Sequence, residues 1–294
     1  MPHWELSWQL AAIVAVCLFS AAGLARLSRS RAPTVAMPFL RESGFVVALY
    51  ALWQYAGSFS VMGTEGALGR AEWIWRAERA WHLPSETSIQ RLVLPHPLAV
   101  ETFNIYYASM HFMVLIIFLF WLFARHRAHY RRIRTILVCV TAASLLIQLV
   151  PVAPPRMLTG IGLIDTAQAY NQSVYSFGGA MADQFSAMPS VHVAWAMLIG
   201  FGVWRVTSSR GRWLAIAHAV VTWIVVVATA NHFWLDGIVA TALLLLALFV
   251  VAGVRALRAA VPKVGLVPRG DLAPAETVAD KLGVTPDVRS MGVR

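Results

Sequence analysis

Four side chains in the second half of the chain have the chemistry needed to move a phosphoryl group: Arg156, His192, His232 and Asp236. His232 and Asp236 are four residues apart, which places them on one helical face, where a carboxylate can orient an imidazole. A histidine can act as a nucleophile or as an acid and base, and a guanidinium can bind two phosphate oxygens. The set is sufficient for phosphoryl transfer, and we expect no metal ion and no other cofactor.

The surroundings of His192 and Arg156 also favour an anionic ligand. Pro189 and Ser190 form a helix-start signal with Ser190 as the N-cap, so His192 falls in a first turn whose free amides attract anions. Two prolines precede Arg156 and would stiffen its approach. We therefore expect Arg156 and Ser190 to contribute to phosphate binding.

A weaker polar stripe runs along the third apolar segment, where Glu101, Asn104 and His111 recur at helical spacing. Core packing and binding of a substrate headgroup are equally compatible with it, and Asn104 and His111 remain candidate substrate-binding residues. The other histidines are interpreted as structural hydrogen-bonding groups. Among them, His218 is expected in mid-span, away from the His192 and His232 cluster.

The composition indicates the elements that must position these residues. Of 294 residues, 59% are hydrophobic and 13% are charged, which is too apolar for a soluble domain. The basic residues behind the net charge of +10 alternate with apolar runs, so we interpret them as setting the orientation in the membrane. We expect no nucleic-acid partner. The sequence predicts an all-α bundle of six to seven transmembrane spans, placed at 7–25, 43–63, 98–124, 135–152, 190–207, 213–230 and 233–257.

Basic residues set the predicted orientation. Most of the 24 lysines and arginines fall on one side of the membrane if the N-terminus is outside, and the positive-inside rule makes that side cytoplasmic. By the parity of crossings, Arg156, His192 and His232 then share the extracytoplasmic side, and the C-terminus is cytoplasmic.

Three regions are expected along the chain. Residues 1–42 form an extra N-terminal span and a cytoplasmic loop, 43–257 form the catalytic membrane domain, and 258–294 form a flexible cytoplasmic tail. Within the membrane domain, the amphipathic, tryptophan-rich segment 64–97 is predicted to include an extracytoplasmic interfacial helix.

These motifs resemble a known enzyme family. P-S-x-H followed by H-x-x-x-D is similar to the type 2 phosphatidic acid phosphatase superfamily. The A-P-P-R segment, the M-P-S-x-H-V-x-W context and the N-H-x-W-L-D ending resemble its branch of inositol phosphorylceramide synthases and bacterial relatives, over about Tyr106 to Gly237.

The resemblance implies that His232 is the nucleophile that forms a phosphohistidine and that Asp236 orients it. It also implies that His192 protonates the leaving alcohol and later activates the acceptor. The superfamily's first motif is absent, and Val226 stands where an arginine six residues before His232 would be. Only Arg156 is therefore carried over as a phosphate ligand.

The predicted function is an integral membrane phosphotransferase that acts on membrane lipids, with transfer of a phosphoinositol-type headgroup to a small hydroxyl acceptor. Water as the acceptor would make it a lipid phosphate phosphatase. A transporter would need mid-span helix breaks and matched halves, which the sequence lacks. A facial triad of His192, His232 and Asp236 for iron is the remaining alternative. The sequence does not determine the oligomeric state.

Overall fold

The computed structural model describes residues 7–27, 31–59, 65–172 and 184–260. In these ranges the secondary structure is helical, with one isolated β-bridge between Val152 and Ser186. The elements, in order, are α1 (Trp8–Leu27), α2 (Arg31–Phe59), α3 (Ala67–Ala80), α4 (Glu86–Val93), α5 (Pro97–Arg125), α6 (Arg127–Gln148), the 3-10 turn η2 (Pro155–Met157), α7 (Thr166–Ala169), α8 (Val191–Val206), α9 (Arg212–Ala228) and α10 (Trp234–Ala260).

The all-helical class predicted from the sequence is confirmed for the described residues, and a helix occupies most of each range predicted to span the membrane. Three helices, α1, α5 and α10, are long and apolar enough to cross a bilayer, while α8 and α9 are shorter apolar helices. The outer faces of α5 and α10 are apolar, as shown by the exposed side chains Ile117 and Phe120 on α5 and Leu246 and Phe249 on α10. Such faces are suited to lipid, and the chain is a membrane protein.

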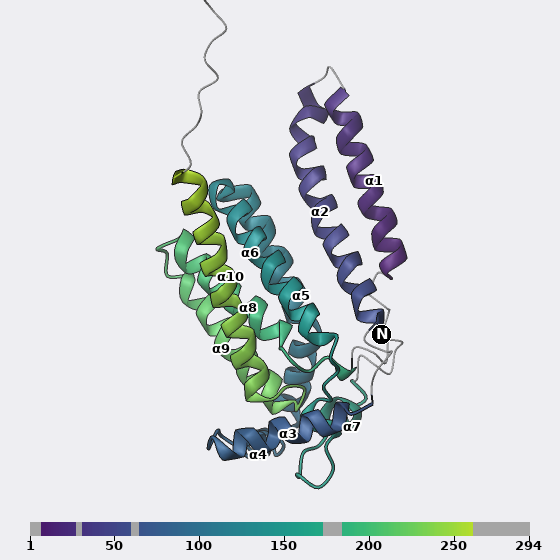
Figure 1. Cartoon of the computed structure of the whole chain (residues 1–294), viewed down its shortest axis with the longest axis vertical. Coiled ribbons are helices and arrows are strands. Elements are labelled where there is room, and N and C mark those ends of the chain that lie inside the picture. The colour runs from purple at the N-terminus through teal and green to yellow at the C-terminus, as the bar shows by residue number, and fades with distance from the viewer. Residues whose placement is uncertain (1–6, 28–30, 60–64, 173–183, 261–294) are drawn as a thin grey trace, which may run out of the picture. The chain divides into compact units, whose positions relative to one another are not determined.

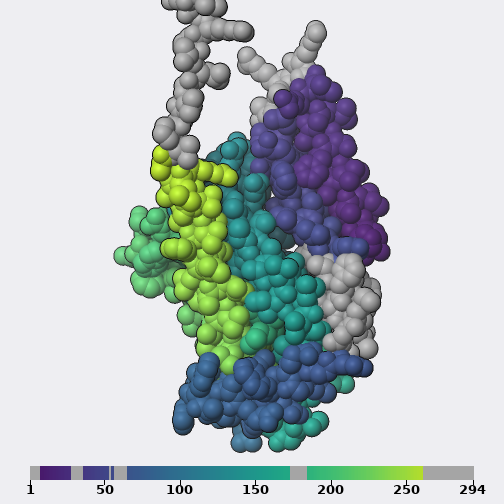
Figure 2. Space-filling model, viewed as in Figure 1, coloured from purple at the N-terminus to yellow at the C-terminus, as the bar shows by residue number. Residues whose placement is uncertain are grey.

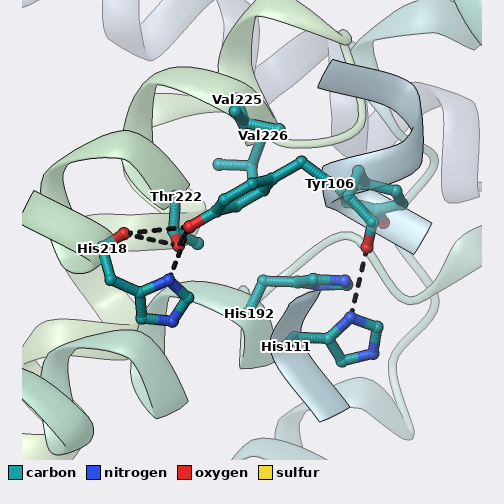
Figure 3. Close-up of a pocket in the computed structure, with 8 residues that line it drawn as sticks. Tyr106, His111, His192, His218, Thr222, Val225 and Val226 are labelled. Carbon is teal, nitrogen blue, oxygen red and sulfur yellow. Dashed lines mark hydrogen bonds between the residues drawn. The ribbon is translucent and has the colours of Figure 1, made fainter. Parts of the chain in front are cut away.

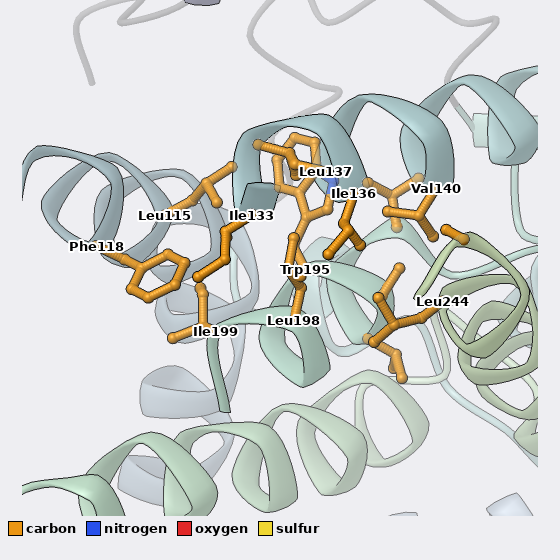
Figure 4. Packing of buried hydrophobic residues seen from close by; sticks show 14 of the residues in the cluster. Leu115, Phe118, Ile133, Ile136, Leu137, Val140, Trp195, Leu198, Ile199 and Leu244 are labelled. Atoms are coloured by element: carbon orange, nitrogen blue, oxygen red, sulfur yellow. The ribbon is translucent and has the colours of Figure 1, made fainter. Parts of the chain in front are cut away.

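The main hydrophobic core lies between α5, α6, α8, α9 and α10, which run side by side in Figure 1. Figure 4 shows Phe118 from α5 beside Ile133 from α6 and Ile199 from α8, with Leu244 from α10 further along the same cluster. Gly202 allows this approach, because a Cβ atom there would lie 2.5 Å from the Phe118 ring. The core fixes the helix ends that carry the candidate site.

A second cluster of buried side chains covers one end of this bundle. The short helices α3 and α4 lie across the ends of α5 and α10, as Figures 1 and 2 show. Ala71 and Ile74 of α3 pack with Val152, Ala187 and Phe233, which belong to three different loops. Backbone hydrogen bonds join the same segments: Val152 N donates to Phe185 O and Ala187 N donates to Val152 O. The loops at this end of the bundle are therefore held together by packing and by backbone pairing.

The N-terminal helices form a hairpin in which α1 packs along α2. An ion pair between Glu42 of α2 and Arg134 of α6 and an edge-to-face contact between Tyr50 and Phe112 join α2 to the bundle. The chain divides into two compact units, 1–253 and 254–294. Of the second, only the last turns of α10 are described, so the tail predicted at 258–294 lies outside the described residues from 261 onwards.

Candidate active site

His232 and Asp236 meet at the start of α10. His232 lies in the α9–α10 loop (229–233), so the two residues do not share a helical face as their spacing predicts, but His232 Nδ1 is 3.3 Å from Asp236 Oδ2. The same carboxylate oxygen accepts a hydrogen bond from Phe233 N at 2.8 Å. Asp236 is the third residue of α10 and reaches back to the backbone amide just before the helix, as the acidic member of a capping box does. The helix start therefore fixes the carboxylate beside the imidazole.

The hydrogen bonds of His232 determine its tautomer. Its Nδ1 is 2.7 Å from the carbonyl oxygen of Ala187. A carbonyl oxygen can only accept, so Nδ1 carries the proton and Nε2 of the neutral ring carries the lone pair. His232 Nε2 is buried and has no hydrogen-bond partner in the described part of the chain. The atom with the free electron pair is thus the one available to an incoming electrophile.

Burial lowers the pKa of His232 to about 4. The hydrogen bond to Ala187 opposes this shift, and the positive charge of Arg156 adds to it. The ring is therefore neutral at pH 7, as a nitrogen nucleophile must be.

His192 faces this pair from the first turn of α8. Ser190 is the N-cap residue, as the sequence predicts, and its Oγ accepts from Val193 N at 3.4 Å. The His192 ring centroid is 5.6 Å from that of His232. Tyr107 of α5 stacks on His192 at 4.3 Å with an interplanar angle of 17°. His192 Nε2 is also buried without a hydrogen-bond partner among the residues described.

His111 belongs to the same group of rings. Its centroid is 4.1 Å from that of His192, and its Nδ1 is 3.2 Å from Tyr107 O (Figure 3). The structure thus brings His111 into the candidate site. The side chain of Asn104 donates to Gln172 Oε1 and accepts from Thr166 Oγ1, so it holds the 166–172 segment.

The prediction that His218 lies away from the cluster is wrong. His218 lines one small cavity together with His111 and His192, as Figure 3 shows. Its Nδ1 is 2.6 Å from the hydroxyl of Tyr106, so a hydrogen-bonding role is present as expected. Counting residues along α9 places His218 far from the α9–α10 loop, but α5 passes close to both and joins them through Tyr106 and Tyr107.

Arg156 is hydrogen-bonded to the α9–α10 loop. Its backbone N donates to Ala230 O at 3.0 Å, and its guanidinium donates to Asn231 Oδ1. Its Nε is 3.1 Å from Asp165 Oδ2. The guanidinium is therefore fixed beside the residue that precedes His232, where its charge acts on that ring.

Sequence reasoning missed two groups of acidic and amide residues at this end of the bundle. Asp165 is the N-cap of α7 and the ion-pair partner of Arg156. Glu78 and Gln90 are buried and hydrogen-bond to the segments on either side of the α9–α10 loop. Glu78 had a signal in the sequence, because it continues the buried face of Ala67, Ala71 and Ile74 on α3.

No three His, Cys, Asp or Glu side chains are grouped as ligands for a metal ion within the described ranges. The arrangement joins an oriented neutral imidazole, a second imidazole and a fixed guanidinium. These groups can attack, protonate and bind a phosphate ester.

Comparison with known families decides the class. The sequence model of the PAP2 superfamily matches residues 72–250, which include every residue of this candidate site. The chain belongs to the PAP2 superfamily. PAP2 proteins are phosphatases and phosphotransferases that act on phosphate esters, including lipid phosphates, so the chain is a membrane enzyme of this kind. Neither a curated protein nor a solved structure matches the chain significantly.

Proposed function

We propose that this PAP2 protein is an integral membrane phosphotransferase that moves the phosphate-containing headgroup of a lipid to a hydroxyl acceptor through a phosphohistidine at His232. The observation that carries the proposal is the state of His232. Its Nδ1–H is held by Ala187 O and Asp236, and its buried Nε2 is directed to no other group among the described residues.

In the first step, Nε2 of His232 attacks the phosphorus atom and the bond from phosphorus to the lipid alcohol breaks. The leaving oxygen takes a proton from His192, so the products are a free lipid alcohol and His232 that carries the phosphate with its headgroup. Asp236 stabilises the positive charge that develops on the His232 ring. In the second step, His192 takes the proton of the acceptor hydroxyl, whose oxygen attacks the phosphorus and releases His232.

Two features supply charge stabilisation for the phosphoryl oxygens. Arg156 lies beside the α9–α10 loop, and its planar guanidinium suits two oxygens of one phosphate. The first amides of α8 follow Ser190 and give the positive end of a helix dipole beside His192. Ser190 contributes indirectly: as the N-cap residue it fixes the start of α8, and with it the direction of these amides.

For the donor we propose a lipid with a phosphoinositol-type headgroup, and for the acceptor an organic hydroxyl. This is the reaction of the inositol phosphorylceramide synthase branch, which the A-P-P-R and N-H-x-W-L-D segments resemble. Burial of both reactive nitrogens supports transfer over hydrolysis, because an enclosed site limits the competing access of water.

The membrane arrangement that we propose has an interfacial layer made by α3 and α4 and a span at each of seven other helices: α1, α2, α5, α6, α8, α9 and α10. Trp73 of α3 is 65% exposed, and Trp81, the C-cap residue of the same helix, is 67% exposed. Such exposure is expected for tryptophans in a headgroup region. The arginine-rich connections between α5 and α6 and between α8 and α9 lie at the end of the bundle away from α3 and α4 (Figure 1). By the positive-inside rule, the arginine-rich end is cytoplasmic. In this arrangement the active site, at the opposite end, faces the extracytoplasmic side.

Product analysis tests this function. The purified protein is incubated with phosphatidylinositol or phosphatidic acid, each labelled with ³²P, in the presence and absence of diacylglycerol, ceramide or a soluble polyol. The proposal predicts labelled transfer products that require the acceptor and are lost in His232→Ala. Release of labelled phosphate alone, at a rate that no acceptor changes, would show a phosphatase instead.

A further inference from the structure

The start of α10 lacks a polar N-cap side chain of its own. The residue before the helix is Phe233, whose ring is fully buried in the second cluster. Asp236 satisfies the amide of Phe233, but a helix start has further free amides that need acceptors. The amide of Leu235 receives its acceptor from another helix: Glu78 Oε1 of α3, at 2.7 Å. Glu78 thus does for α10 what an N-cap serine does for other helices.

The other side of the α9–α10 loop is held by the same layer. Gln90 of α4 donates to Ala228 O, the last residue of α9, at 3.2 Å. Gln90 also exchanges hydrogen bonds with the backbone of Ile164, at 2.9 Å in each direction. Glu78 and Gln90 therefore hold the two ends of the short segment that contains His232.

We propose that Glu78 is a positioning residue of the active site: it caps α10 across the bundle and thereby holds Asp236 in register with His232. This inference rests on the function proposed for His232 and adds a residue to that site. Glu78 touches no substrate in this account and acts through the backbone amide of Leu235.

The surroundings of Glu78 indicate that it does this as a neutral carboxylic acid. Its side chain is fully buried, and it faces Glu86 of α4, Arg79 of α3 and Asp236 of α10. Arg79 is 3.2 Å from Glu86 Oε2 but 3.8 Å from Glu78 Oε2, so its charge mainly compensates Glu86. Burial raises the pKa of Glu78 to about 9, and the hydrogen bond with Glu86 and the charges of Glu86 and Asp236 act in the same direction. Because Oε1 accepts from Leu235 N, the proton of the neutral acid belongs on Oε2.

Three variants of the full-length protein test the inference. Glu78→Gln keeps a neutral acceptor of the same shape, whereas Glu78→Leu removes the acceptor and leaves the Leu235 amide buried and unpaired. Glu72→Leu is the matched control, because Glu72 lies on the same helix but is exposed.

Hydrogen exchange of the peptide 229–240, measured by mass spectrometry without substrate, reports how well Glu78 protects the Leu235 amide. We expect faster exchange at Leu235 in Glu78→Leu, and exchange like that of the parent in Glu78→Gln and Glu72→Leu. We also expect Glu78→Leu to lower kcat about tenfold or more, the equivalent of one unsatisfied buried amide, with little change in KM for the lipid. Glu78→Gln should stay within about threefold of the parent.

A pH profile separates positioning from general stability. The parent should lose activity as Glu78 ionises above about pH 9 and repels Glu86 and Asp236, whereas Glu78→Gln should keep its activity there. If Glu78→Leu does not fold, this comparison still decides the matter. Unchanged exchange at Leu235 in a folded Glu78→Leu, or Glu78→Gln as inactive as Glu78→Leu, overturns the inference. Full activity in His232→Ala would instead remove the proposed function and leave the exchange result to stand alone.

Discussion

Replacing Asp236 with asparagine separates two effects that a carboxylate beside a histidine can have. One effect is the choice of tautomer, and the other is stabilisation of the charge that the ring gains as it bonds to phosphorus. In a Ser-His-Asp triad the same substitution selects the wrong tautomer and costs about 10⁴ in rate. Here a second acceptor is present, because Ala187 O lies 2.7 Å from His232 Nδ1, closer than Asp236 Oδ2 at 3.3 Å.

The carbonyl of Ala187 should keep the proton on Nδ1 when Asp236 becomes asparagine, so only the charge effect is lost. At 3.3 Å and an effective dielectric constant of about 20, two full charges interact by about 5 kcal/mol. With about half a positive charge on the ring in the transition state, the loss is about 2.5 kcal/mol, or roughly 70-fold in rate. Asparagine Oδ1 can still accept from Phe233 N, so the helix start is preserved.

The assay is single-turnover formation of labelled enzyme from a ³²P-labelled lipid, with rapid quenching in base, in the parent, Asp236→Asn and His232→Ala. We expect Asp236→Asn to form phosphoenzyme about two orders of magnitude more slowly than the parent, to the same final level per folded protein. A rate within a few-fold of the parent would show that Asp236 stabilises no charge in the transition state. A rate as low as that of His232→Ala would refute the tautomer argument from Ala187.

Three further predictions concern other parts of the site. His192→Gln should reduce kcat by about 10² to 10⁴ but spare substrates with a good leaving group such as p-nitrophenol, because those need no proton from His192; equal loss on both substrates would contradict the acid role. Because burial lowers the pKa of His232 to about 4, its nucleophilic form persists as the pH falls from 7, so kcat/KM should decline near pH 4 and not near 6.5; a titration of kcat/KM from pH 3.5 to 8 checks this sign. Gly237→Ala should destabilise the folded protein by about 1–3 kcal/mol, since its Cβ would lie 2.5 Å from the Trp223 ring beside Asp236; an unchanged thermal unfolding temperature in detergent would contradict that packing.

The helices and the central pair of the site could be predicted from the sequence because both depend on local patterns. Apolar runs of bilayer length mark helices wherever they occur. The spacing of His232 and Asp236 predicts that they meet, although His232 lies in the loop before α10 and Asp236 reaches back to it from the first turn. The N-cap role of Ser190 follows from the same local reasoning.

The residues that were missed depend on contacts between distant segments. Asp165 meets Arg156 because η2 is hydrogen-bonded to the α9–α10 loop and Gln90 links Ile164 to the end of α9. Glu78 meets Leu235 across more than 150 positions of the chain. His218 lies in mid-helix, and only the passage of α5 joins it to His192. The pattern of one sequence predicts on which face of a helix a residue lies, but it does not predict which distant segment packs against that face.

The central claim is that a phosphoryl group is carried by His232, and mapping the modified residue tests it most directly. The enzyme is mixed with a ³²P-labelled lipid donor without acceptor, quenched in base, digested and sequenced by mass spectrometry under conditions that preserve phosphohistidine. The account predicts a phosphoryl-containing adduct on His232, absent from His232→Ala and discharged when a hydroxyl acceptor is added to the parent. Turnover with no adduct on His232, or an adduct on His192 or another residue, would contradict it.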